Sequence, residues 1–294
     1  MSLNLEIIPQ LVLSGLALGA IYAFIGVGFV TIHAVTGFIN FAQGEFAMVG
    51  AMVAITLVAR GVPLPAAVLG GVVAATLVGL LTERLAVHPV RQRSPLIVLV
   101  TTVAASTVLR GAALFLWGTE PYRLPAFSPG PPLAIGPGVI SRQELWILGL
   151  MVVVMIALAL FFERTLPGVA MRACAENFVA SRLVGISPAT MALFAFGLSA
   201  LLAGLAGVAV APTTFATYDM GLMLGLKGFV AAVLGGLRSA PGAVLGGLLL
   251  GILESLGAGL IASGYKDALA FVVLLLVLVV RPEGLLAVLR QRAA

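Results

Sequence analysis

The chain has 294 residues, of which 61% are hydrophobic and only 9% are charged, where soluble domains carry about 25% charged residues. With a mean hydropathy of +1.19, this composition excludes a soluble protein and predicts an all-α protein that crosses the membrane many times. The single cysteine and the two histidines lack partners at metal-ligand spacing, which argues against zinc and disulfide redox chemistry.

Apolar stretches recur along the whole chain and predict about 8 to 10 membrane helices. The candidate spans cover residues 10–32, 37–59, 64–82, 95–117, 144–162, 190–211, 219–237, 241–259 and 266–281. The stretches between them are too short for a soluble domain of about 100 residues. We therefore expect residues 1–294 to form a single transmembrane domain that relies on partners for any ATPase activity.

The second span opens with polar residues, in the sequence GFINFAQGEF at positions 37–46. A regular helix would put Asn40 and Gln43 on one face and point Glu45 away from them. Because two glycines can interrupt the helix here, we predict a broken or re-entrant helix that lines a cavity. The sequence also permits these polar groups to tie the helix to its neighbours, or to lie near the cytoplasmic interface.

The connections on the two sides of the membrane differ in character. Residues 118–143 are rich in proline and glycine, so we expect a periplasmic loop there, and Arg110 is expected to snorkel outward. Residues 163–188 predict a short amphipathic helix on the inner face, which docks a partner or contacts only lipid. Its apolar side would hold Met171, Ala175, Phe178 and Leu183, opposite Arg172, Glu176 and Arg182.

Lys227 lies near membrane depth, where an unpaired ammonium costs several kcal/mol. Glu45, Glu254 and Asp219 are its candidate partners, and the sequence leaves open a structural ion pair or a contact with substrate. The helices that carry Glu45 and Lys227 are predicted to run in opposite directions, which is the pattern of an inverted repeat with broken helices.

The basic residues predict the orientation of the chain. Placing segments 82–94 and 163–188 on the same side collects ten of the 16 Lys and Arg residues there, leaves four on the other side, and leaves Arg110 and Lys227 at membrane depth. The positive-inside rule then puts the N-terminus outside and the C-terminus in the cytoplasm. This asymmetry accounts for the pI of about 10.0 as membrane topology, so nucleic-acid binding is not needed to explain it.

Several motifs resemble the permease subunits of branched-chain amino acid ABC importers, a family that includes urea and related amide permeases. The motifs are GFINFAQGE (residues 37–45), AMRACAENFVASRLVGI (170–186), GLKGFVAAVLGG (225–236), PGA (241–243) and RPEGL (281–285). Their order and separations are similar to those of the family over nearly the whole chain. The resemblance implies a transport subunit of the bacterial inner membrane, and not an enzyme.

The resemblance also implies partners and roles. The chain would bind no cofactor itself, because two separate cytoplasmic subunits would bind ATP and Mg²⁺, a periplasmic binding protein would deliver the substrate, and a longer sister permease would complete a heterodimer. The inner segment would be the coupling helix that sits on an ATPase. Its local equivalents are Arg172, Ala173, Ala175, Glu176, Asn177 and Gly185.

Polar residues at membrane depth are the candidates for the substrate pathway: Asn40, Gln43, Glu45, Thr101, Thr102 and Lys227. The expected substrates are branched-chain or other small neutral amino acids, with urea, amides or small aromatic acids as alternatives within the family. A stand-alone secondary transporter or channel that uses Glu45 or Glu254 is the alternative from a different class. The chain lacks HExxH and GxSxG motifs, which argues against an intramembrane enzyme.

Overall fold

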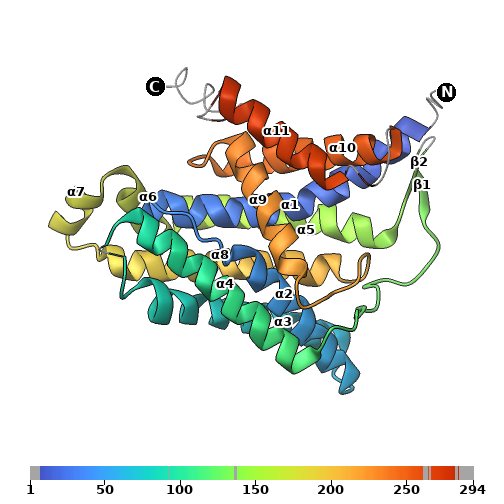
Figure 1. The fold of residues 1–294 in the computed structure, drawn as a ribbon, viewed down its shortest axis with the longest axis horizontal. Coiled ribbons are helices and arrows are strands. Elements are labelled where there is room, and N and C mark those ends of the chain that lie inside the picture. Colours follow the sequence, from blue (N-terminus) through green and yellow to red (C-terminus); the bar gives the residue numbers. More distant parts are fainter. Residues whose placement is uncertain are drawn as a thin grey trace.

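A computed structural model describes residues 7–91, 93–135, 138–260, 264, 266–281 and 284. Residues 282, 283 and 285 of the C-terminal motif therefore lie outside the described residues. The described chain is almost entirely helical (Figure 1). Its only strands, β1 (Leu133–Ile135) and β2 (Gly138–Ile140), form a small antiparallel hairpin. The predicted all-α class is confirmed.

Six described helices are long and apolar enough to cross a membrane. They are α1 (Ile8–Thr36), α3 (Leu64–Leu81) continued by the π-helix η2 (Thr82–Val87), α4 (Pro95–Trp117), α5 (Arg142–Arg164), α8 (Pro188–Val210) and α10 (Ala240–Leu260). Three shorter apolar helices accompany them: α2 (Gln43–Ala59), α9 (Met220–Gly235) and α11 (Lys266–Val280). Each of the nine predicted spans therefore contains a helix.

Helices α1 and α8 form the centre of the bundle and run in opposite directions (Figure 1). Most of both helices is buried, and α1 packs closely against α10 because both carry small residues at the contact. A Cβ atom on Gly19 of α1 would lie 2.7 Å from the carbonyl oxygen of Gly247 of α10. Larger side chains at this crossing would push the two helices apart.

The helices form two structurally related halves, α1–α2–α3 and α8–α9–α10. Helix α1 packs on α9 and α10, and α8 packs correspondingly on α2 and α3. Glycines mark equivalent contacts, Gly26 of α1 with Gly228 of α9 and Gly50 of α2 with Gly204 of α8. Helices α2 and α9 run in opposite directions (Figure 1), so the predicted inverted repeat is confirmed.

Residues 37–42 are not helical, so the second span opens with the predicted break and its helix starts later than residue 37. Gly37 ends α1 in a left-handed conformation with φ of 79°, and α2 begins only at Gln43. The Asn40 carboxamide oxygen instead accepts a hydrogen bond from the backbone N–H of Ala42 (3.1 Å). The face that a regular helix would give to Asn40 and Gln43 is therefore absent, which agrees with the predicted break in the helix. Residues 211–219 form the equivalent non-helical segment before α9.

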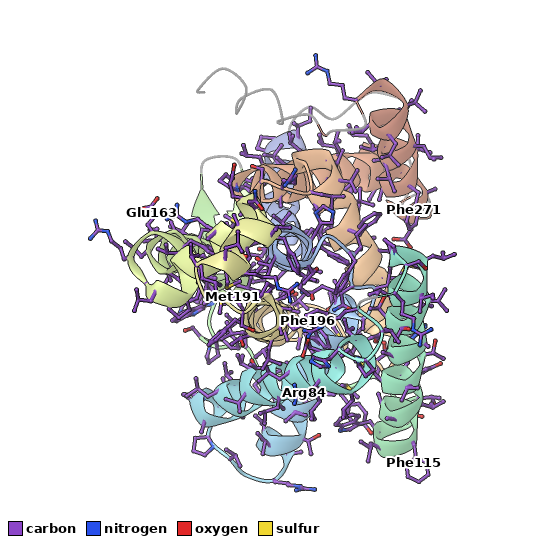
Figure 2. The ribbon with its side chains drawn as sticks, turned by 90° about the vertical axis from the view of Figure 1, so that its left-hand side faces the viewer. Arg84, Phe115, Glu163, Met191, Phe196 and Phe271 are labelled. Atoms are coloured by element: carbon purple, nitrogen blue, oxygen red, sulfur yellow. The ribbon has the colours of Figure 1, made fainter. Side chains whose placement is uncertain are left out.

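The two ends of the bundle carry different connections. At one end lie η2, α6 (Leu166–Glu176) and α7 (Phe178–Leu183), together with the start of α8. Figure 2 looks onto this end and labels Arg84, Glu163 and Met191, from three segments that meet there. At the other end, the hairpin contacts the start of α1, where the backbone N–H of Val139 donates to Gln10 Oε1 (2.6 Å).

Candidate functional site

Glu45 lies in the first turn of α2 and is only 1% exposed. Its Oε1 accepts a hydrogen bond from Ser106 Oγ (2.9 Å) and lies 3.2 Å from Arg110 Nε, both on α4. The prediction that Arg110 only snorkels outward is therefore wrong, because a buried carboxylate within reach offers it an ion pair. Glu45 Oε2 has no hydrogen-bond partner among the described residues. This cluster fastens α4 to α2.

The other predicted pathway residues of this region are also in the interior. Gln43 and Ser199 exchange two contacts, since Gln43 Nε2 donates to the Ser199 carbonyl (3.0 Å) and Ser199 Oγ donates to Gln43 Oε1 (2.6 Å). Thr102 accepts from the backbone N–H of Phe41 (3.2 Å). The Asn40 carboxamide nitrogen has no hydrogen-bond partner among the described residues. The structure thus places Asn40, Glu45 and Thr102 around the start of α2.

Thr101 is set apart from its neighbour Thr102. Its hydroxyl donates to the carbonyl of Ile97 one turn earlier on α4 (2.8 Å). Thr102 is fully buried, whereas Thr101 lies toward the outer face of the helix, where Leu96, Val100 and Val108 are exposed. Consecutive helical residues diverge by about 100°, so the two threonines cannot present their hydroxyls to the same space.

Lys227 belongs to a separate cluster that joins four helices. Its Nζ lies 2.8 Å from Glu254 Oε1 on α10 and 2.7 Å from Asp267 Oδ1 on α11. The hydroxyl of Tyr22 on α1 donates to Glu254 Oε2 (2.9 Å), and the ammonium lies 5.6 Å from the Tyr22 ring centroid. Of the predicted partners, Glu254 is confirmed. The described residues contain no ion pair of Lys227 with Glu45 or Asp219.

The inner segment forms two helices rather than the single helix that the sequence predicts. Helix α6 ends at Glu176, and the Asn177 side chain then caps α7 by accepting from the backbone N–H groups of Val179 (3.0 Å) and Ala180 (2.9 Å). This cap satisfies amides that would otherwise lack partners at the start of a helix. The chain therefore turns at Asn177, and the two helices do not share one continuous face.

The apolar residues of this segment divide between the two helices. Met171 and Cys174 of α6 are buried in a cluster that includes Met191 and Phe196 of α8. Phe178 and Leu183, predicted for the same apolar side as Met171, are instead 50% and 84% exposed, because the turn at Asn177 rotates α7 away from the bundle.

Helix α7 and the residue that follows it present apolar side chains that the sequence prediction missed. Val179 is 68% exposed and Val184 is 74% exposed, next to the exposed Leu183. The capping residue Asn177 was the available signal, since Asn is typical of helix N-termini. Gly185 ends this projection with φ of 83°. Arg172 and Glu176 are exposed, and Ala173 and Ala175 are half-buried.

Comparisons with known proteins agree with the motifs. A family described as the branched-chain amino acid transport system permease component matches residues 11–278. The high-affinity branched-chain amino acid transport system permease protein BraD of Pseudomonas aeruginosa is 36% identical over 291 residues, covering 94% of this chain and 95% of BraD. The corresponding permease protein LivH of Escherichia coli K12 is 34% identical over 299 residues, covering 94% of each chain.

A solved structure has a similar fold. PsaBC from Streptococcus pneumoniae, in complex with Fab, matches with a TM-score of 0.52 over 97% of this chain and 94% of that chain. At 11% sequence identity, this match shows similarity of fold alone. The family match covers nearly the whole helical bundle, and the chain therefore belongs to the family of permease components of branched-chain amino acid transport systems.

Proposed function

We propose that this permease is one transmembrane half of an importer that is driven by ATP hydrolysis in two separate cytoplasmic subunits. Branched-chain or other small neutral amino acids are its substrates, as the printed names of BraD and LivH support. A periplasmic binding protein delivers them, and a longer sister permease completes the membrane part. ATP and Mg²⁺ are bound by the partner subunits, and this chain binds no cofactor itself.

The exposed surface of α7 carries the proposal. Val179, Leu183 and Val184 project from one end of the bundle, beyond the ends of the long apolar helices. An apolar cluster of this kind is typical of a docking site for another protein. Residues 163–188 are therefore the coupling segment within the single transmembrane domain, and α7 inserts into a cleft of an ATPase.

The residues of α6 transmit the movement of the ATPase to the bundle. Met171 and Cys174 anchor α6 against α8, so a displacement of α7 moves the end of α8 rather than bending a loose loop. The coupling segment includes six residues proposed to contact the ATPase or to set the turn between α6 and α7: Arg172, Ala173, Ala175, Glu176, Asn177 and Gly185. Closure of two ATPases then reorients the bundle between outward and inward access.

The proposed orientation has α6 and α7 in the cytoplasm, the C-terminus on the same side and the N-terminus outside. The positive-inside rule supports it, because Arg84, Arg91 and Arg93 share the α6 end with Arg172 and Arg182. In this orientation the loop at residues 118–143 is periplasmic and is available to a binding protein.

The substrate pathway runs beside the start of α2 and along α4. The non-helical segment at residues 37–42 and the short helix α2 leave polar groups at membrane depth, which membrane proteins reserve for cavities and transport pathways. Asn40, Glu45 and Thr102 border this route, with Gln43 behind them, whereas Thr101 faces away from it. Lys227 contributes through its ion pairs, which hold α9 to α10 and α11.

The test compares two valine-to-aspartate substitutions at opposite ends of the bundle. Val179→Asp puts a charge on the α7 surface, and Val139→Asp makes the same change on the exposed hairpin at the other end. Loss of one apolar contact at the centre of an interface costs about 1–3 kcal/mol. We therefore expect Val179→Asp to lower recovery of the ATPase subunits about tenfold or more.

Recovery is measured by affinity purification of the tagged chain from membranes, followed by ATP-dependent uptake in proteoliposomes. Val139→Asp should recover the ATPase subunits at the normal level. Equal recovery with both variants would overturn the docking role of α7. Uptake by the chain alone, driven by a proton gradient, would overturn the ATP-driven function.

A further inference from the structure

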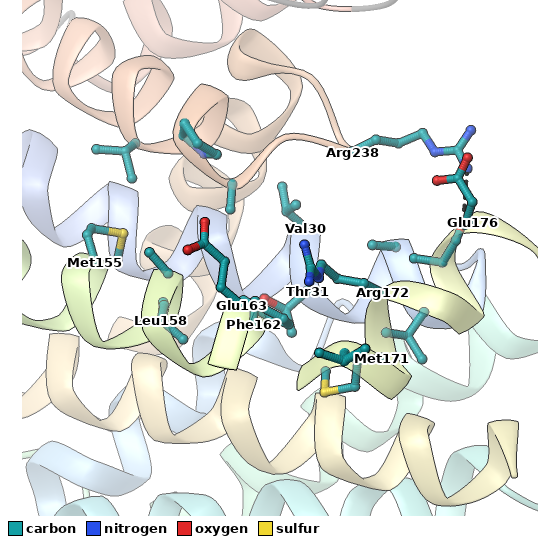
Figure 3. Close-up of a pocket in the computed structure, with 18 of the residues that line it drawn as sticks. Val30, Thr31, Met155, Leu158, Phe162, Glu163, Met171, Arg172, Glu176 and Arg238 are labelled. Carbon is teal, nitrogen blue, oxygen red and sulfur yellow. Dashed lines mark hydrogen bonds between the residues drawn. The ribbon is translucent and has the colours of Figure 1, made fainter. Parts of the chain in front are cut away.

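A large cavity opens beside α1 at the end of the bundle that carries α6 (Figure 3). Its volume is about 1050 Å³, and its walls come from α1, α5, α6 and α10. The interior is mainly apolar and includes Val30, Leu158, Phe162, Val244 and Leu245. Three of these walls, α1, α5 and α10, are helices long and apolar enough to cross a membrane, so an apolar ligand can enter from the lipid.

A second, smaller cavity lies toward the other end of α1. It has a volume of about 410 Å³ and is lined by Leu11 and Leu18 of α1, Ile147 of α5 and Ala258 of α10. Residues 22–29 of α1, which lie between the two cavities, are buried, so the two cavities are separate. The larger cavity alone is therefore the candidate ligand site, and we call it the furrow.

Four charged side chains surround the mouth of the larger cavity: Glu163, Arg172, Glu176 and Arg238. Figure 3 shows Glu163 and Arg172 directed into the same space, and Arg238 beside Glu176. Arg238 reaches across from the turn before α10, and its Nη2 donates to the Ala175 carbonyl on α6 (3.4 Å). The mouth thus offers two guanidinium groups and two carboxylates at the end of an apolar furrow.

We propose that the furrow binds a phospholipid with a zwitterionic headgroup, such as phosphatidylethanolamine. The acyl chains lie in the apolar part of the furrow, the headgroup phosphate binds Arg172 and Arg238, and the ammonium binds Glu163 and Glu176. Guanidinium groups suit phosphate because they present paired donors. Two other occupants fit less well. A purely anionic headgroup would be repelled by the two carboxylates, and an apolar protein helix over the mouth would remove water from all four charges without pairing them.

This site shares Arg172 and Glu176 with the proposed coupling segment, but it is tested by lipid binding and not by uptake. The intact transporter, purified with its accompanying subunits and stripped of lipid, is titrated with phosphatidylethanolamine or phosphatidylglycerol and examined by native mass spectrometry. We expect at least one phosphatidylethanolamine to stay bound at concentrations where phosphatidylglycerol does not.

Two matched variants locate the bound lipid on α5. Ala159 lines the cavity and is exposed, whereas Ala157 is exposed on the other side of the helix. Ala159→Trp should lower retention of phosphatidylethanolamine about tenfold, and Ala157→Trp should leave it unchanged. Because both alanines are exposed, neither substitution disturbs the core. Arg238→Ala should weaken retention without filling the furrow.

Three results would overturn the proposal. The first is equal retention of phosphatidylethanolamine by the Ala159→Trp and Ala157→Trp variants. The second is tighter binding of phosphatidylglycerol than of phosphatidylethanolamine. The third is efficient cross-linking of an Ala159→Cys variant to another polypeptide in native membranes, which would identify a protein helix as the occupant.

Discussion

The two halves of the bundle hold buried charges of opposite sign at related places. In the first half, the carboxylate of Glu45 on α2 binds Arg110 on α4. In the second half, the ammonium of Lys227 on α9 binds Asp267 on α11 and Glu254 on α10. Each pair joins the short helix of its half to the peripheral helix that follows. Both halves therefore use an ion pair to join these helices, but the short helix carries the acid in the first half and the base in the second.

The two clusters differ in how completely they are satisfied. Lys227 has two carboxylate partners, and Glu254 also accepts from Tyr22. Glu45 has one oxygen without a hydrogen-bond partner among the described residues, and the side chain of its partner Arg110 is 26% exposed. We infer that the second cluster fixes the bundle, whereas the first can change its contacts during transport.

The largest expected effect of a substitution is at Lys227. Lys227→Met removes the cation and leaves Glu254 buried without it, which costs about 3–5 kcal/mol for a buried pair. We expect a clearly lower melting temperature of the purified transporter in detergent. Adding Glu254→Gln to this variant should restore part of the stability, because the uncompensated charge is then removed. An unchanged melting temperature for Lys227→Met would contradict the structural role of the cluster.

The crossing of α2 and α9 connects the two halves and should be the next most sensitive place. A Cβ atom on Gly44 would lie 2.6 Å from the backbone nitrogen of Gly225 and would also meet the carbonyl of Gly221. Gly44→Ala should therefore destabilise the protein by about 1–3 kcal/mol through overpacking, measured by the same thermal unfolding.

The matched control for this crossing is Gly111→Ala on α4, where an added Cβ meets nothing within 4 Å. A glycine-to-alanine change in a helix is otherwise favourable by about 0.5–1 kcal/mol. We expect the control to keep or raise the melting temperature. Equal losses in the two variants would show that the crossing is looser than the structure indicates.

The smallest effect on stability is expected at Glu45. Glu45→Gln keeps an oxygen for Ser106, and Arg110 can move toward solvent, so the cost should be about 1 kcal/mol or less. Uptake by the reconstituted transporter should nevertheless fall, because Glu45 borders the proposed pathway. Unchanged uptake together with a loss of stability as large as that of Lys227→Met would reverse the comparison between the two clusters.

Sequence reasoning succeeded where one segment decides the outcome. The apolar stretches located the six long and three shorter apolar helices of the described residues, and the composition of residues 118–143 predicted a loop. Where two segments meet it succeeded only in part, because Glu254 was among the predicted partners of Lys227 but other contacts were missed. The partner of Arg110 depends on how α4 lies against α2, and Asp267 was missed as a partner of Lys227 because it lies 40 positions away on another helix.

Prediction from sequence was also incomplete within the inner segment, residues 163–188. An amphipathic pattern predicted one helix with Met171 and Leu183 on the same side, but the cap formed by Asn177 divides the segment. A hydrophobic pattern cannot distinguish residues that pack on the bundle from residues that await a partner, because both are apolar. Burial in the tertiary structure made that distinction.

The sequence by itself determined that the protein is an integral membrane protein, where its helices lie and which family it resembles. These properties depend on apolar content and short motifs, which act locally along the chain. Only the tertiary structure decided which charges pair, which apolar residues of α7 remain exposed and where the furrow beside α1 opens. Those properties depend on helix crossings, and small changes in the direction of a helix determine which side chains come within a few ångströms of each other.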